Sequence, residues 1–227
     1  MICPCDGKVV VIEEVEEPEY LKDRRGEYAE RYGALSPWRG KWDVKFLQDL
    51  KVSEDKISDQ KLSIFGNLPY NISTEILSKW ILNVGSNFWF ESLTLMFQKE
   101  VADRIISEFN NSNYGRLSIL SNWKLNVKKI IDIKPQSFSP RPKIDSSLLL
   151  FTPKEKFFKL KNPKNLEKIT RIFFSQRRKM LKKPFNQVFD NGKEVAEKFG
   201  IDLNLRPQNL EPEVYFKLVK EYEDLRG

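Results

Sequence analysis

The chain has 227 residues and a formal net charge of +7, with 40% hydrophobic and 31% charged residues. This composition is typical of a soluble globular protein with one large domain, or with one medium domain and a small one. No apolar run approaches the ~18 residues of a membrane span, and the first residues lack the pattern of a signal peptide, so we expect a cytoplasmic protein without a membrane partner. Histidine is absent, and Cys3 and Cys5 are the only cysteines, so the sequence predicts no metal site and no Ser-His or Cys-His mechanism.

The apolar pattern predicts strands that alternate with helices, followed by helices alone. Residues 62–66 are expected to form a buried strand, and the helix that follows is expected to have Ser73 as its N-cap. A second strand and two helices come next, and a further pair of strands is predicted over residues 125–133 and 147–151. Alternating strands and helices indicate an α/β sheet, with the last pair as an antiparallel hairpin at its edge. From Pro163 onward the pattern is helical only.

The segment between the first strand and its helix, Asn67-Leu68-Pro69-Tyr70, suits the binding of a flat ring that carries an amine. The Asn67 side chain and the backbone carbonyl of Leu68 or Pro69 can accept hydrogen bonds from that amine and orient its nitrogen for attack. Proline stiffens the turn, and stacking on the Tyr70 ring is worth roughly 1–3 kcal/mol per base. The alternative is an ordinary strand-to-helix turn, in which asparagine and proline are common.

A proline-rich loop over residues 135–142 joins the last two predicted strands. Pro140 and Pro142 hold the segment around Arg141 extended, so we expect Phe138 to project into a cleft beside Tyr70. An aromatic ring on each face is a common way to hold a base out of its stack. The alternative is that Phe138 is a core residue beneath a rigid loop.

Positive charge is concentrated between Lys154 and Lys183, a segment that contains 12 basic and two acidic residues. Residues 1–60, by contrast, carry a net charge of −4. Such a density indicates a polyanion partner such as RNA, whose binding weakens steeply as salt rises. The alternative is a solvated basic face that keeps the protein soluble. The residues predicted to contact RNA are Arg141, Lys143, Arg177, Arg178, Lys179, Lys182 and Lys183.

Six segments, in this order along the chain, resemble the ribosomal RNA adenine dimethyltransferase family: residues 64–73, 96–104, 114–118, 138–146, 177–180 and 206–210. The resemblance covers about residues 46–222 and is weak before residue 62. It implies transfer of methyl groups from S-adenosylmethionine to N6 of two adjacent adenines near the 3′ end of small-subunit ribosomal RNA, on a pre-30S particle and without a metal. It also implies that Asn67 and Tyr70 hold the adenine and that Phe138 stacks on its other face.

The expected fold is α/β, a truncated Rossmann-like methyltransferase sheet with a small C-terminal all-α domain. The expected boundaries are an atypical N-terminal segment at 1–45, a partial methyltransferase domain at 46–151 and a helical RNA-binding domain at 152–227.

The cofactor-binding part of the family pattern is not found in this sequence. Family members carry a glycine-rich turn that lets the backbone approach the cofactor, whereas no two of the ten glycines here lie two positions apart. Asp49 is a weak match to an acidic cofactor contact, and Asn67 is the other expected contact. Residues 3–23 resemble instead a fragment of a phosphatidylserine decarboxylase, without that family's serine cleavage motif, which suggests a replaced or misjoined N-terminus.

Two main hypotheses follow, an adenine dimethyltransferase and an RNA-binding remnant that has lost methyl transfer. A lipid-metabolism fragment is a third and weaker alternative.

Overall fold

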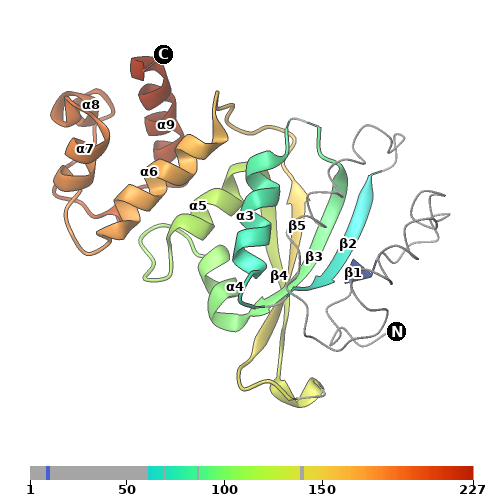
Figure 1. Ribbon diagram of the computed structural model, residues 1–227. Helices are drawn as coiled ribbons and strands as arrows, with labels where there is room; N and C mark the ends of the chain where they lie inside the picture. Colours follow the sequence, from blue (N-terminus) through green and yellow to red (C-terminus); the bar gives the residue numbers. More distant parts are fainter. Residues whose placement is uncertain (1–8, 11–60, 69, 86, 139–140, 227) are drawn as a thin grey trace.

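The computed structural model describes residues 9–10, 61–68, 70–85, 87–138 and 141–226 (Figure 1). Most of the predicted N-terminal segment, and Asp49 and Pro69, therefore lie outside the described residues. The strands are β1 (Val9–Val10), β2 (Leu62–Asn67), β3 (Phe90–Gln98), β4 (Leu125–Ile133) and β5 (Ser146–Pro153). The helices are α3 (Ser73–Asn83), α4 (Lys99–Ile105), α5 (Arg116–Lys124), η3 (Pro135–Ser137), α6 (Pro163–Ser175), α7 (Lys182–Val188), α8 (Gly192–Lys198), η4 (Pro207–Asn209) and α9 (Pro212–Arg226).

Within the described residues the strands form one sheet of five, in the order β1-β2-β3-β5-β4. β2 and β3 are parallel and are connected through α3, whereas the other three pairs are antiparallel. Figure 1 shows α3, α4 and α5 on one face of this sheet. The predicted α/β class and the antiparallel hairpin at the edge, β4 with β5, are confirmed.

β3 lies in the middle of the sheet because its sequence can be buried on both faces. The run from Leu93 to Phe97 is buried at every position. Burial at consecutive positions is expected for a central strand, whose side chains are covered on both faces of the sheet. Phe97 also meets Phe151 of β5 edge to face, with ring centres 6.0 Å apart. This core fixes where β2 and β3 end, and so positions the turn that follows β2.

The predicted capping role of Ser73 is wrong. Ile72 occupies the N-cap position of α3, and its carbonyl accepts a hydrogen bond from the amide of Ile76 at 2.9 Å. The Ser73 hydroxyl instead donates to the carbonyl of Tyr70 at 3.2 Å. A serine side chain can satisfy either a helix start or the turn before it, and the sequence does not distinguish the two.

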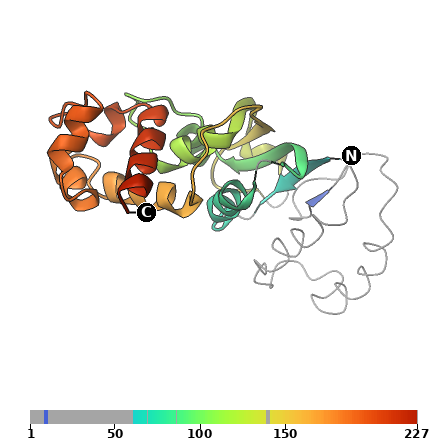
Figure 2. The same ribbon diagram turned by 90° about the horizontal axis from the view of Figure 1, so that it is seen from above.

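After β5 the described chain is helical, as the pattern from Pro163 onward predicted. Figure 2 shows α6 to α9 gathered at one end of the molecule, away from β1 and β2. The core of this helical part contains Phe173, Phe185 and Tyr215, whose rings pack edge to face at 5.3 and 5.5 Å.

Glu223 of α9 caps the start of α6. Its carboxylate accepts hydrogen bonds from the backbone amides of Lys161 and Asn162, both at 2.8 Å, and from the Asn165 side chain at 3.1 Å. Glu223 is buried, and a negative charge at this helix terminus also complements the helix dipole. The last helix is therefore tied to the first helix of the same part of the chain.

Candidate active site

The candidate site lies at the carboxyl ends of the parallel strands β2 and β3. Asn67 ends β2 and pairs in register with Met96, and β3 ends two residues later at Gln98. In open α/β sheets ligands bind beyond the carboxyl ends of parallel strands. Asn67 is half-buried, and the Leu68 side chain is buried in the core. The turn predicted to hold an amine is thus anchored at the edge where such a ligand binds.

Tyr70 is held at two points. Its hydroxyl lies 2.7 Å from the Oγ atom of Ser146, the first residue of β5, and its backbone carbonyl accepts the hydrogen bond from Ser73. Ser146 is fully buried, whereas Tyr70 is half-buried. The tyrosine ring is therefore fixed before any ligand arrives, which favours stacking because little motion is lost on binding.

Phe138 lies in a loop that leaves the sheet at the same end, beyond the carboxyl ends of β2 and β3. Ile133, the last residue of β4, pairs with Ser146, and the 3-10 turn η3 begins two residues later at Pro135. The amide of Phe138 donates to the carbonyl of Pro135 at 3.2 Å, and the Phe138 side chain is half-buried. The fold thus brings this loop and the Tyr70 turn to one edge of the sheet. That the Phe138 ring faces Tyr70 across a cleft stays a prediction.

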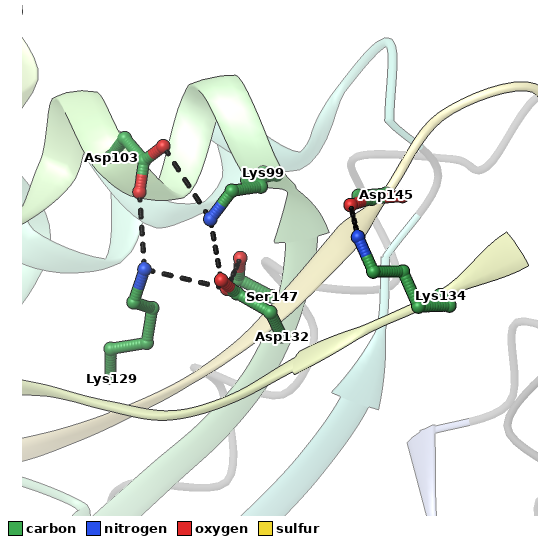
Figure 3. Close-up of polar contacts among 7 residues, drawn as sticks. All are labelled: Lys99, Asp103, Lys129, Asp132, Lys134, Asp145 and Ser147. Carbon is green, nitrogen blue, oxygen red and sulfur yellow. Dashed lines mark hydrogen bonds and ion pairs between the residues drawn. The ribbon is translucent and has the colours of Figure 1, made fainter.

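A cluster of charged side chains lies close to this site, where α4, the second half of β4 and the start of β5 meet (Figure 3). The Lys99 ammonium lies 2.5 Å from Asp132 and 3.9 Å from Asp103. Lys129 lies 3.3 Å from Asp103 and 3.4 Å from Asp132. The Ser147 hydroxyl donates to the second Asp132 oxygen at 2.6 Å. Asp132 is therefore the common partner of two cations and one hydroxyl, and we call these five residues the Asp132 cluster.

A β-bulge makes this cluster possible. The register between β4 and β5 shifts between Lys129 and Ile131, so Lys129 pairs with Leu149 and Asp132 pairs with Ser147. In a regular strand two residues three positions apart point to opposite faces, but the extra residue of a bulge reverses that alternation. Lys129 and Asp132 therefore share the face covered by α4.

The charges of the cluster hold one another in their ionised forms. Hydrogen bonds from Lys99 and Ser147 hold the pKa of the Asp132 carboxyl well below its usual range. The hydrogen bond to Asp132 in turn raises the pKa of Lys99. Neither group is poised to exchange a proton near neutral pH, so the cluster supports the site's structure rather than its proton transfer.

The predicted RNA-contact residues fall into three places. Arg141 and Lys143 are exposed on the loop after Phe138. The Arg177 guanidinium is instead used within the protein, where it donates to the side chain of Gln208 at 3.3 Å and to the carbonyl of Ser112. The remaining residues lie around one hollow of about 680 Å³, and its basic lining residues are Arg178, Lys179, Lys182, Lys183 and Arg206.

Sequence reasoning missed Ser146, Asp132 and Arg206. Ser146 and Arg206 stand within segments that carry the family resemblance, but nothing in their spacing shows that the first meets Tyr70 or that the second joins the basic hollow. Asp132, near the end of an amphipathic strand, has no local signal that distinguishes it from a solvated carboxylate.

A methyl donor that carries a nucleoside would lie across the carboxyl ends of neighbouring strands. Asn67 and the residues just after it place carbonyl groups at these strand ends. These groups fit the part of the site that would bind the adenine amine. On the outer side of β2 the described neighbour is the two-residue antiparallel strand β1, with Val9 opposite Gly66. The described residues therefore fit the part of the site that holds the base, and Asp49, the predicted donor contact, lies outside them.

Neither a metal-binding cluster nor a membrane-spanning helix is found among the described residues. Among them, no group of three or more acidic or cysteine side chains is placed to hold a metal ion. None of the helices described is long and apolar enough to cross a membrane.

Comparison with known proteins identifies relatives over most of the chain. The model of a family described as ribosomal RNA adenine dimethylase matches residues 41–224. The ribosomal RNA small subunit methyltransferase A of Pelagibacter ubique is 90% identical over 187 residues, which cover 82% of this chain and 71% of that protein. The protein of the same name from Wolbachia sp. subsp. Drosophila simulans is 39% identical over 191 residues, with coverages of 84% and 69%.

Solved structures agree with this fold. A dimethyladenosine transferase from Plasmodium falciparum has a TM-score of 0.59 and 25% identity, and the match covers 88% of this chain and 77% of that protein's chain. The 23S rRNA methyltransferase ErmE, at 16% identity and a TM-score of 0.51 over 92% of this chain and 79% of its own, supports the fold alone. The predicted Rossmann-like methyltransferase fold is confirmed. The comparisons give no support to a phosphatidylserine decarboxylase fragment at residues 3–23.

Proposed function

The chain belongs to the ribosomal RNA adenine dimethylase family, and on this basis we propose that it dimethylates N6 of adenine in small-subunit ribosomal RNA. The observation that carries this proposal is the Tyr70 turn, which stands at the carboxyl edge of β2 inside the segment matched to the family. We propose S-adenosylmethionine as the methyl donor, two adjacent adenines near the RNA 3′ end as the acceptors, a pre-30S particle as the partner and the cytoplasm as the location. We propose no metal.

The residues at the edge of the sheet divide the work of holding the base. The Asn67 side chain and a backbone carbonyl of the Leu68–Pro69 turn accept hydrogen bonds from the adenine amine, which orients the nitrogen and favours the pyramidal geometry needed for attack. Tyr70, fixed by Ser146, provides one stacking face, and Phe138 provides the other.

No general base is required in this scheme. The donor supplies an electrophilic methyl group, and the amine releases its proton to water after it has been alkylated. The protein's contribution is therefore position and desolvation rather than proton transfer.

The RNA backbone is held elsewhere. We assign phosphate contacts to the basic hollow lined by Arg178, Lys179, Lys182 and Lys183, to which Arg206 is added, and to Arg141 and Lys143 on the loop beside the base. Arg177 acts there indirectly, because its guanidinium fixes the loop at Asn111 and Ser112. This arrangement accords with a division into an N-terminal segment at 1–45, a methyltransferase part at 46–151 and a helical RNA-binding part at 152–227, which we retain as a proposal.

A binding protein without methyl transfer is the second candidate, because no two glycines of the chain lie two positions apart. The deciding experiment measures three quantities on the full chain. Equilibrium dialysis measures binding of labelled S-adenosylmethionine, and a filter assay measures transfer of the label to small subunits that lack the modification. A filter-binding assay measures RNA affinity. Donor binding and labelled dimethyladenine in the RNA support the enzyme. RNA binding without donor binding at millimolar concentrations supports the second candidate.

A further inference from the structure

The loop that carries Phe138 has two stems that lie side by side. Lys134 directly follows β4, Asp145 directly precedes β5, and Ile133 and Ser146 pair between them. The position of these stems sets where the loop emerges relative to the Tyr70 turn.

Lys99, the first residue of α4, holds both stems at once. Its backbone amide donates to the carbonyl of Asp145 at 2.9 Å, and its ammonium lies 2.5 Å from the Asp132 carboxylate (Figure 3). A second ion pair, between Lys134 and Asp145 at 2.6 Å, closes the stems directly. Because Lys99 follows β3 without a break, it links the loop to the middle of the sheet.

Two consecutive serines transmit this position to the base-holding turn. Ser147 donates to Asp132 within the Asp132 cluster, and Ser146 meets the Tyr70 hydroxyl. Consecutive residues of a strand point to opposite faces, so the start of β5 is held from the α4 side and holds Tyr70 from the other side. Both serines are fully buried, which leaves them little room to move independently.

We propose that Lys99 and Asp132 are positioning residues, which set the separation between the Tyr70 turn and the Phe138 loop and hence the fit of the adenine between them. The proposal rests on the proposed function. Neither residue touches the base. Their side chains are about one-third exposed, at 37% and 34%, so their pairing contributes little to global stability and its loss acts locally.

The test compares four variants of the full chain, three at lysines and Asp132→Asn. Lys99→Met removes the ammonium but keeps the backbone amide that bonds Asp145. Lys99→Arg is the conservative variant that restores the charge. Lys79→Met is the matched control, because Lys79 forms a comparable pair with Glu75 at 2.8 Å on α3 and is 39% exposed.

Hydrogen–deuterium exchange is measured on the peptide that spans residues 134–145, together with kcat and RNA affinity. We expect exchange in this peptide to rise several-fold in Lys99→Met, to return to the original rate in Lys99→Arg and to stay unchanged in Lys79→Met. We also expect kcat to fall about tenfold with RNA affinity changed less than twofold, because a small misplacement of a bound group slows reaction more than it weakens binding.

Unchanged exchange in Lys99→Met would overturn the proposal, as would an equal rise in the peptides of α6 and α9, which would indicate a general loss of structure. Asp132→Asn, which can keep the Ser147 hydrogen bond but loses the ion pairs with Lys99 and Lys129, must also raise exchange in the same peptide. The exchange result does not depend on activity. If the unmodified chain transfers no methyl group, the proposed function fails while the positioning of the loop is still decided.

Discussion

Replacing Lys124 by methionine is expected to remove a pH dependence from the protein's stability. Lys124 is 2% exposed, and its ammonium donates to the carbonyls of Ile81 and Val84, at 3.0 and 2.5 Å, where α3 ends. It also lies 4.0 Å from the centre of the Trp123 ring. Burial lowers the pKa of Lys124 from 10.5 to about 8. Methionine has a similar length and carries no charge.

The direction of the effect follows from the two pKa values. Between pH about 8 and pH about 10.5 the unfolded chain keeps the proton that the folded chain has released, so the free energy of unfolding rises with pH. The gap between the two values corresponds to about 3 kcal/mol. The burial cost is present in full below the folded pKa, and it disappears once the pH exceeds the unfolded pKa.

The assay is urea unfolding of the unmodified chain and of Lys124→Met at several pH values from about 7 to about 10.5. The difference between their free energies of unfolding must shift by about 3 kcal/mol in favour of the unmodified chain across this range. Tyrosine and cysteine titrations cancel in the difference, and the lost packing or capping adds only a constant. A difference that stays constant with pH would refute the reasoning, and Lys79→Met, at an exposed site, must give a constant difference.

Three further predictions concern the base, the RNA and the helical part. Asn67→Ala is expected to lower methyl transfer about 100-fold, the scale of losing one preorganised hydrogen-bonding group, while RNA affinity in a filter-binding assay changes less than twofold. Charge reversal at Lys182 and Lys183 is expected to weaken RNA binding and to lower the slope of log affinity against log salt by about one to two. Glu223→Ala is expected to lower the free energy of unfolding by about 2–4 kcal/mol, because three hydrogen bonds to a buried charge are lost.

Each of these predictions has a matched control. Asn83→Ala changes an exposed asparagine on α3, and equal activity in this control and in the Asn67 variant would refute the role of Asn67. Charge reversal at the exposed Lys217 and Lys220 on α9 must leave a steeper salt slope than reversal in the hollow. Asp224→Ala breaks an exposed pair with Lys161 at 3.1 Å and is expected to cost less than about 1 kcal/mol. A similar cost for Glu223→Ala would show that its hydrogen bonds contribute little.

The strands and helices were predictable from the sequence wherever local pattern decides the structure. The predicted strand over residues 125–133 coincides with β4, and the predicted helical pattern from Pro163 onward begins where α6 begins. Proline cannot donate a backbone hydrogen bond, so it marks a helix start reliably. Ser73 failed as a signal because its hydroxyl donates to the carbonyl of Tyr70 in the preceding turn and does not cap α3.

The candidate site was predictable only in the residues of a continuous segment. The turn from Asn67 to Tyr70 was found because its chemistry is contained in four neighbouring positions. Its support comes from Ser146, which is 76 residues away along the chain. A hydroxyl with one long-range partner has no local periodicity, and strand pairing must be known before the two side chains can be placed together.

The Asp132 cluster shows why register matters more than composition at this edge. Lys129 and Asp132 are three positions apart, a spacing that would separate them onto opposite faces of a regular strand. The bulge before Ile131 places them together, where Lys99 and Ser147 complete the contacts of Asp132. A bulge depends on how two strands pair and not on either strand alone. The ionic support of the Phe138 loop is therefore a property of the paired strands, and a substitution that shifts the register would separate these side chains without changing any of them.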